Sequence, residues 1–206
     1  MKKIFNLIIV DESGSMSIIR KQAFAGMNET LKTIRALAEQ EPEMEQHVSL
    51  LTFDTRGMRY KFDITPAAAT SDLAWQDYNP CGGTPLYDAI GISVSKLNAQ
   101  VGADDNVLVT IITDGEENCS REWTLTMVRT LIEKLKRQNW TFTLIGTDNL
   151  DVEGMAQDFA IDEHLKFAET PAATDAMFAQ ERKSRVRYSM CIKRGKKGET
   201  GTFFDN

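Results

Sequence analysis

Two patterns of apolar and polar residues alternate along the chain. Short, mostly apolar runs predict strands at residues 4–10, 47–53, 106–113 and 140–147, with further strand-like segments at 58–64 and 163–167. Between them, apolar residues recur at spacings of three and four. This spacing predicts helices over 17–40, 85–101, 121–138 and 151–160, and a last helix from about 171 to about 191.

Strands separated by helices predict an α/β fold of the doubly wound, Rossmann-like type, with a mainly parallel sheet and helices on both faces. The segments 47–53 and 58–64 are the exception, because only the stretch DTRG lies between them. A connection this short predicts a hairpin, so one edge strand should pair antiparallel. In such folds ligands bind beyond the carboxyl ends of the strands.

The composition is that of a globular protein, with 42% apolar and 26% charged residues in a chain of 206. We interpret residues 1–191 as one domain and residues 192–206 as a basic, mobile tail with little to bury. The net charge of −6 argues against non-specific binding of nucleic acid. No segment approaches the ~20 apolar residues of a membrane span, and the apolar run in MKKIFNLIIV is short for a signal peptide.

The three cysteines, Cys81, Cys119 and Cys191, are widely spaced and odd in number. This pattern suits a reducing compartment better than a disulfide framework. We therefore expect a cytoplasmic protein whose thiols are free.

The first apolar run ends in DESGSM, a stretch of small side chains that carry oxygen. Asp11, Ser13 and Ser15 are each separated by one residue, so in a loop their side chains can turn toward one point, and Gly14 eases the curl of the backbone. A compact set of oxygen ligands suits a hard divalent cation such as Mg²⁺. The alternative is that Ser13 or Ser15 only caps the helix that begins near residue 17.

Two other positions carry oxygen-bearing side chains that could bind the same cation. Thr84 follows two glycines just before a predicted helix, and Asp114 ends the apolar strand 106–113. Each has a simpler interpretation, because Thr84 with Pro85 is a common helix start and Asp114-Gly115 is a common turn. All of these positions fall on the same edge of the predicted sheet, which favours one shared cation site.

With these residues in place, the chain resembles the von Willebrand factor A (VWA) domain family over residues 3–185. DESGSM matches that family's Asp-x-Ser-x-Ser motif, and Thr84 and Asp114 match its two other metal-site positions, so the metal-ion-dependent adhesion site is complete. A stand-alone domain of this size is similar to small cytoplasmic bacterial members, including those of tellurite-resistance and stress-response systems.

The resemblance implies roles for these residues. Ser13, Ser15 and Thr84 would bind the metal through their hydroxyls, and Asp11 and Asp114 would act largely through water and by orienting the serines. The metal would be Mg²⁺ or another divalent cation such as Mn²⁺ or Ca²⁺. Its remaining ligand would be an Asp or Glu of a protein partner, so the expected function is protein–protein interaction rather than catalysis. The oligomeric state stays open.

Two alternatives are weighed against this interpretation. A magnesium-dependent phosphotransfer enzyme of similar layered fold also carries an aspartate after its first strand, but the second acid that a dehalogenase-like phosphatase needs is here Ser13, and no lysine lies near these loops. A structural subunit stiffened by metal is the other. Further acids near the strand ends are interpreted as solvated loop residues, or as groups that steer a basic partner: Glu12, Asp54, Glu116, Glu117 and Asp148.

Overall fold

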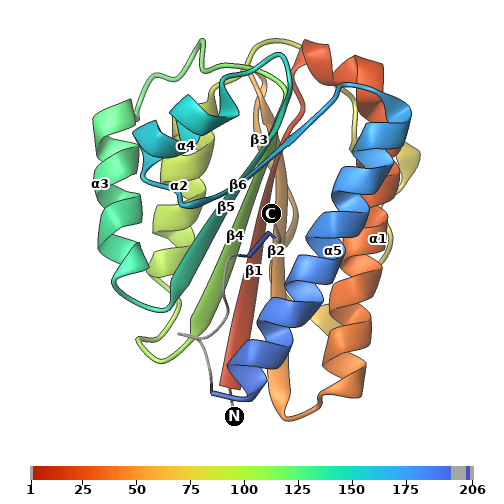
Figure 1. The fold of residues 1–206 in the computed structure, drawn as a ribbon, viewed down its shortest axis with the longest axis vertical. Helices are drawn as coiled ribbons and strands as arrows, with labels where there is room; N and C mark the ends of the chain where they lie inside the picture. The colour runs from red at the N-terminus through yellow and green to blue at the C-terminus, as the bar shows by residue number, and fades with distance from the viewer. Residues whose placement is uncertain (1, 196–202, 205–206) are drawn as a thin grey trace.

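The computed structural model describes residues 2–195 and 203–204, and a six-stranded sheet forms its centre (Figure 1). The order across the sheet is β3-β2-β1-β4-β5-β6, and all neighbouring strands are parallel except β2 and β3. The predicted α/β class with one antiparallel edge strand is confirmed. The strands are β1 (Lys2–Asp11), β2 (Met44–Asp54), β3 (Gly57–Pro66), β4 (Asn106–Thr113), β5 (Trp140–Thr147) and β6 (Glu163–Phe167).

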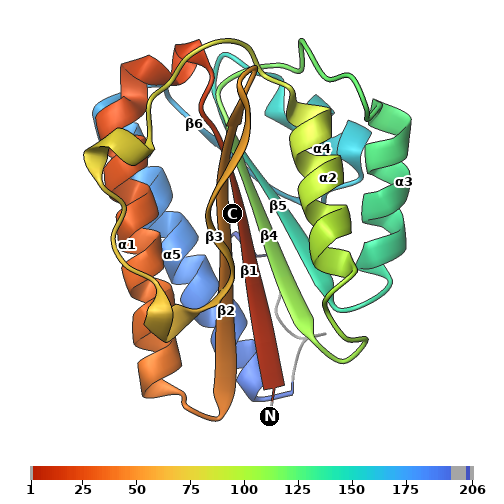
Figure 2. The ribbon, with the colours of Figure 1, turned by 180° about the vertical axis from the view of Figure 1, so that it is seen from behind.

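Helices cover both faces of the sheet. Helices α1 and α5 lie on one face and α2, α3 and α4 on the other, as the two opposite views show (Figures 1 and 2). Three short 3₁₀ segments, η1 (Gly14–Ile19), η2 (Ala67–Ala69) and η3 (Trp75–Asp77), lie in the connections. The helices are α1 (Arg20–Gln40), α2 (Leu86–Asn98), α3 (Leu125–Lys136), α4 (Val152–Phe159) and α5 (Pro171–Lys193).

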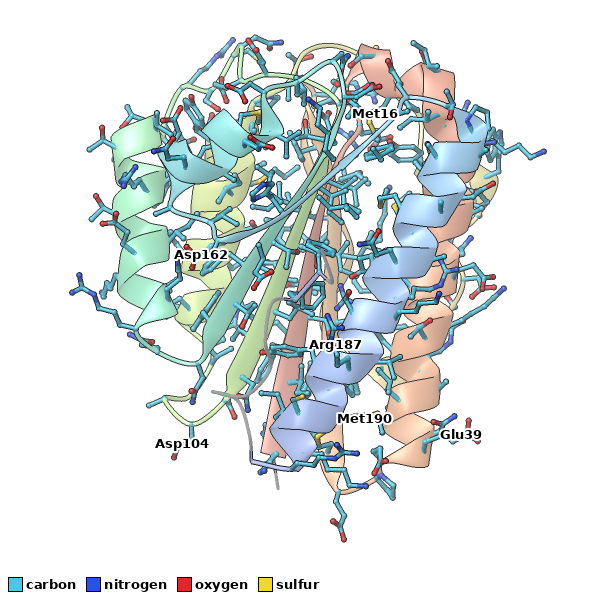
Figure 3. The ribbon with its side chains drawn as sticks, in the orientation of Figure 1. Met16, Glu39, Asp104, Asp162, Arg187 and Met190 are labelled. Atoms are coloured by element: carbon cyan, nitrogen blue, oxygen red, sulfur yellow. The ribbon has the colours of Figure 1, made fainter. Side chains whose placement is uncertain are left out.

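Two helices begin later than the sequence pattern predicts. The helix expected from residue 17 starts as η1, and α1 follows only at Arg20. Residues three apart share one face of a 3₁₀ helix, so Met16 (labelled in Figure 3) and Ile19 are both buried. The helix expected from residue 121 begins at Leu125, because Thr124 caps it by accepting a bond from the Met127 amide at 3.4 Å.

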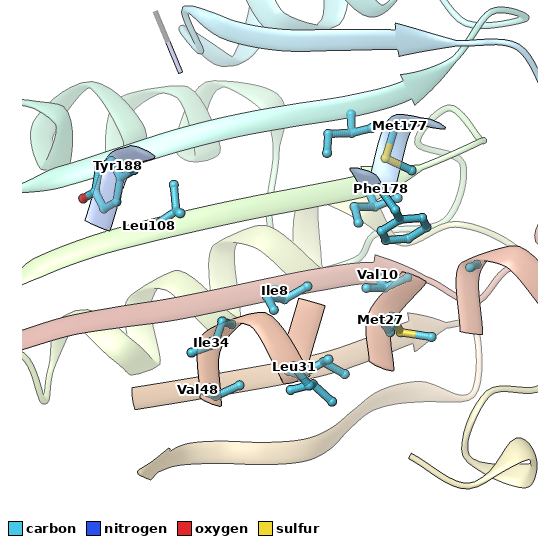
Figure 4. Close-up of a cluster of buried hydrophobic side chains, with 14 of the residues drawn as sticks. Ile8, Val10, Met27, Leu31, Ile34, Val48, Leu108, Met177, Phe178 and Tyr188 are labelled. Atoms are coloured by element: carbon cyan, nitrogen blue, oxygen red, sulfur yellow. The ribbon is translucent and has the colours of Figure 1, made fainter. Parts of the chain in front are cut away.

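The sheet separates two apolar cores. One lies between the sheet and the pair α1 and α5, where Leu31 of α1 and Phe178 of α5 belong to the same buried cluster as Ile8 and Val10 of β1 (Figure 4). A Cβ atom on Gly26 of α1 would lie 2.2 Å from the Phe178 ring, so these two helices pack closely only because residue 26 is glycine. The second core lies between the sheet and α2, α3 and α4.

The edge strand β3 is irregular. Its pairing with β2 shifts register between Val48 and Leu50 and again between Leu50 and Leu51. Close to the shift, Ile64 has a positive φ of 47°, which is unusual for a β-branched residue. The amide of Ile64 is satisfied by the Ser49 hydroxyl at 2.9 Å, so the strand bends without leaving this donor unpaired.

The C-terminal region differs from the sequence expectation of a mobile tail. Helix α5 continues to Lys193, and Phe203 and Phe204 are only 5% and 2% exposed within the core under α5. The Phe203 ring lies 6.2 Å from that of Tyr188, and Arg187 (labelled in Figure 3) donates to the Phe203 carbonyl. The two phenylalanines are therefore part of the packing; the rest of the predicted tail beyond residue 195 lies outside the described residues.

A buried ion pair connects α5 to the sheet. Arg185, which is 1% exposed, donates to Glu181 on its own helix at 2.9 Å. It also donates to Asn6 of β1 at 2.6 Å and to Thr110 of β4 at 2.9 Å. These directional bonds fix the position of α5 along the two central strands. Residue type alone does not show that the partners of Arg185 lie in the sheet, so this role is not predictable from the sequence.

Replacing Phe203 and Phe204 by alanine should destabilise the protein by about 3 kcal/mol or more, because burying a phenylalanine contributes about 3–5 kcal/mol relative to alanine. Urea unfolding measures the change. Met190→Ala on the same helix, at a position that is 43% exposed, is the control and should change stability little. A loss below about 1 kcal/mol in the double variant would show that the two rings are not held in the core.

Arg185→Met should cost about 3–5 kcal/mol, because it leaves the carboxylate of Glu181 buried without its cation. Adding Glu181→Leu removes that charge, so the double variant should be more stable than Arg185→Met alone. Denaturant unfolding of the single and double variants provides the comparison. A double variant that is less stable than the single one contradicts this account of the pair.

Candidate functional site

The carboxyl ends of β1 and β4 bring three loops together. Asp11 ends β1, Asp114 follows β4, and the loop before α2 lies between them. Backbone bonds join the loops: the amide of Gly14 donates to the carbonyl of Gly82 at 3.0 Å, and the amide of Cys81 to that of Glu12 at 2.8 Å. Gly82 has a φ of +74°, a conformation in which a side chain would be strained.

Asp11 is fully buried and both of its carboxylate oxygens are held. The amide of Ser13 donates to Oδ1 at 2.7 Å, and the hydroxyl of Thr113 donates to Oδ2 at 2.7 Å. The hydroxyl of Tyr78 donates to the Asp11 carbonyl at 2.7 Å. These bonds fix the end of the strand and the direction of the carboxylate, so Asp11 presents a positioned charge.

The other predicted ligands surround this carboxylate. The hydroxyls of Ser13 and Ser15 lie 3.1 Å apart, and Ser15 donates to Asp114 Oδ1 at 2.8 Å. Thr84 faces the same point, because a Cβ atom built on Gly115 would lie 2.9 Å from Thr84 Oγ1 and 3.7 Å from Asp11 Oδ2. The structure therefore brings the five residues predicted from the sequence to one place: Asp11, Ser13, Ser15, Thr84 and Asp114.

The charge at this place is uncompensated by protein groups. Burial raises the pKa of Asp114 to about 7, and the nearby Asp11 adds to the rise, although the Ser15 hydroxyl opposes it. Burial likewise raises the pKa of Asp11. Among the described residues, Asp114 Oδ2 has no hydrogen-bond partner despite its burial. Two buried carboxylates, one with a free oxygen, and three hydroxyls are the surroundings that a hard divalent cation needs.

Carboxylates alone do not make up this candidate metal site, so the hydroxyls of Ser13, Ser15 and Thr84 are part of it. Within the described part of the chain, no three or more His, Cys, Asp or Glu side chains are arranged to hold a metal. His47 stacks on Phe5 with ring centroids 4.8 Å apart and contacts Glu45 at 2.7 Å.

Several residues that position the site were not identified from the sequence. Asn118 accepts from the Thr84 amide at 2.9 Å through its side chain and donates to the Thr84 carbonyl at 3.2 Å through its backbone. Thr113 bonds both Asp11 and the backbone of Gly115. Their signal in the sequence is only proximity to Asp114, since both lie within four residues of it.

Two of the acids near the strand ends were expected to be either solvated loop residues or groups that steer a partner, and the structure shows neither. Glu12 and Asp54 are 2% and 0% exposed, so they are neither solvated nor available to a partner. Arg59 donates to Glu12 at 2.7 Å and to Asp54 at 2.9 Å, and Arg56 also bonds Asp54. Burial opposes ionisation, but bonds from the Arg59 guanidinium and the Asn79 amide hold the pKa of Glu12 below its usual value. This cluster ties the first site loop to the β2–β3 hairpin.

Asp88 and Glu117 organise the loop that follows Asp114. Asp88 accepts from the amides of three successive residues, Arg121, Glu122 and Trp123, at 2.7–2.9 Å. Glu117 accepts from the amides of Tyr87, Cys119 and Ser120. The loop is therefore held against the start of α2. None of the three cysteines forms a disulfide in the structure; Cys81 is exposed, and Cys119 and Cys191 are half-buried.

Comparison with solved structures places this geometry in a known fold. The chain is similar to the SpRpn10 VWA domain, with a TM-score of 0.59 and 15% identity over 85% of this chain and 94% of that one. It is also similar to the pilus adhesin SpaC from Lactobacillus rhamnosus GG (TM-score 0.66, 14% identity, 91% of this chain and 30% of that one). A third similar structure is proximal thread matrix protein 1 from the mussel byssus with a zinc-occupied MIDAS motif (TM-score 0.60, 16% identity, 86% and 46%).

These likenesses show that the chain has a VWA fold. The chain spans less than half of the SpaC and mussel proteins, so it corresponds to one part of each. Comparisons of the sequence with models of known families and with curated proteins give no match. Among the described helices, none combines the length and the apolar character needed to cross a bilayer.

Thr113→Val should destabilise the protein by about 1–3 kcal/mol, because it keeps the shape but leaves Asp11 Oδ2 without its buried donor. Urea unfolding in the presence of a chelator measures this contribution without interference from metal. Thr130→Val, on the exposed face of α3, is the control and should stay within about 0.5 kcal/mol of the parent. Equal stability of the two variants would mean that Thr113 does not hold the carboxylate.

Proposed function

We propose that the protein is a metal-dependent protein–protein interaction module. It binds Mg²⁺, or another divalent cation such as Mn²⁺ or Ca²⁺, beyond the ends of β1 and β4, and then binds a partner through an Asp or Glu side chain. The observation that carries the proposal is Asp114 Oδ2, a buried carboxylate oxygen without a partner beside Asp11 and three hydroxyls.

Each residue has a distinct part in this proposal. The hydroxyls of Ser13, Ser15 and Thr84 would hold the cation, and the carboxylates of Asp11 and Asp114 would balance its charge. A cation held largely by neutral hydroxyls retains its attraction for a further anionic ligand. The neighbouring structure with a zinc-occupied MIDAS motif supports metal binding at this place in the fold. A bacterial stress-response or assembly role rests on the family resemblance alone.

The phosphotransfer alternative has less support. Residues 11–16, 81–85 and 113–119 contain no lysine or arginine that would hold a phosphate. A magnesium-dependent hydrolysis of an aryl phosphate that Asp11→Asn abolishes would favour the enzyme over the interaction module.

The metal site is tested by titrating the protein with Mn²⁺ and following the free ion by electron paramagnetic resonance. Asp114→Asn should weaken Mn²⁺ binding by about thirtyfold or more, because it removes a charge from a buried site. Thr84→Ala removes a neutral ligand and should have a smaller effect. Asp175→Asn, an exposed acid on α5, is the matched control. Equal Mn²⁺ affinity in the parent and Asp114→Asn proteins would overturn the proposal.

The same titration tests the partner's carboxylate, with acetate as its surrogate. Metal and anion should bind with positive coupling, and this coupling is reciprocal. Acetate should therefore raise the apparent Mn²⁺ affinity by about fivefold in the parent protein and leave that of Asp114→Asn unchanged. Chloride at equal ionic strength controls for screening. An acetate effect no larger than that of chloride would contradict a site that is completed by a carboxylate.

A further inference from the structure

A pocket of about 290 Å³ lies between α2, α3 and α4, beside the metal-site loops. These three helices cover the same face of the sheet (Figure 1). The pocket is outside the set of five predicted ligands, and the proposed metal binding does not use it. Its lining residues come from the start of α2, the loop after β4, the start of α3, and α4 with the residue before it.

The pocket and the metal site share two segments of chain. Leu86 and Tyr87 follow Thr84 by two and three residues, and Glu116 and Glu117 follow Asp114 by the same steps. The Tyr87 amide donates to Glu117 Oε2 at 2.9 Å, so the two segments are bonded to each other within the pocket wall. The pocket therefore begins two or three residues along the chain from two of the predicted metal ligands.

The inner wall of the pocket is apolar. Leu86 and Phe159 are buried, and Leu125 and Met155 are partly buried beside them. The rings of Tyr87 and Phe159 meet edge to face, with centroids 5.9 Å apart and an angle of 88°. This wall provides a flat aromatic surface and aliphatic contacts for a side chain that enters the pocket.

The rim is acidic. Glu116 and Asp158 are exposed at the pocket, and neither carboxylate has a partner among the described residues. Glu117 and Asp151 also line it, but their carboxylates are engaged by backbone amides. No basic residue lies among the lining residues of the pocket. Burial raises the pKa of Tyr87, and the charges of Glu117, Asp158 and Glu116 raise it further, so the negative potential converges on the ring.

We infer that this pocket receives an arginine side chain, flanked by apolar residues, from the partner whose carboxylate completes the metal site. The aliphatic part of arginine fits the apolar wall, and its planar guanidinium matches both the Tyr87 ring and the carboxylates of Glu116 and Asp158. The inference rests on the proposed function for the source of the arginine. The chemistry of the pocket itself is independent of metal, and this makes separate tests possible.

The test uses acetyl-leucyl-arginyl-leucine amide, a peptide without a carboxylate, and follows the amide signals of the protein by NMR. With a chelator present, the peptide should shift the amides of Tyr87, Gly154 and Met155, and binding should weaken as salt increases. The matched neutral peptide, with citrulline in place of arginine, should bind at least about fivefold more weakly. Because the metal site is silent under these conditions, the result is independent of whether the metal proposal holds.

Two double variants test whether the carboxylates at the rim of the pocket bind the arginine peptide. Glu116→Gln combined with Asp158→Asn should weaken the arginine peptide by about fivefold, because two rim charges are lost without a change in shape. Glu153→Gln combined with Asp175→Asn removes two exposed acids that do not line the pocket and should leave the affinity unchanged. Both double variants should keep the thermal midpoint of the parent.

Three outcomes would overturn the inference. The first is the absence of shifts at these amides up to about 10 mM arginine peptide, a range in which even weak single-residue contacts are measurable. The second is equal binding of the citrulline peptide, which would make the pocket a purely apolar groove. The third is that the pocket signals shift with protein concentration alone, which would assign the pocket to a second copy of the chain.

Discussion

The arrangement of the whole upper end of the molecule depends on keeping two carboxylates buried and close together. Asp11 ends β1 and Asp114 follows the adjacent parallel strand β4. Burial disfavours the charged form of both acids, and the charge of Asp11 adds to the effect on Asp114. The hydroxyls of Ser15 and Thr113 and the backbone amide of Ser13 donate to these carboxylates and reduce this cost without removing it. One oxygen of Asp114 remains unpaired among the described residues. A cation bound beside the two carboxylates would offset the cost of burying their charges. The loops hold the oxygen atoms in positions that such a cation could contact.

Residues outside the site hold the loops that surround these two acids. Arg59 and Arg56 neutralise Glu12 and Asp54, so the first site loop is fixed to the hairpin by compensated charge rather than by further repulsion. On the other side, Asn118 accepts from the Thr84 amide, and Asp88 accepts from successive amides of the loop that follows Asp114. These bonds keep that loop in contact with the start of α2. The loops that carry the predicted ligands are thus held by polar contacts to neighbouring elements, and these contacts position the ligands before any metal binds.

The sequence predicts the fold, and the meeting of the five oxygen-bearing residues at one place, because both depend on local patterns. The strands 140–147 and 163–167 match β5 and β6, and the oxygen-bearing residues follow directly from strand ends. The sequence fails where a side chain's role depends on a distant partner. The bonds from Arg185 to Asn6 and Thr110 cannot be foreseen from residue type. Glu12 was interpreted as solvated, whereas it is buried and Arg59 donates to it in an ion pair. Phe203 was placed in a tail because nothing in the sequence shows that its ring reaches Tyr188.

The irregular pairing of β3 has a consequence for the behaviour of the protein at high concentration. A regular outer strand exposes a row of amides and carbonyls that a second sheet can extend, and this is a common route to aggregation. Here the register shifts and the positive φ of Ile64 bend that row. Arg59 and Lys61 add charge along the strand, and Pro66 at its end has no amide hydrogen to donate. The opposite edge is short, because β6 has only five residues. Sheet-to-sheet association is therefore disfavoured at both edges.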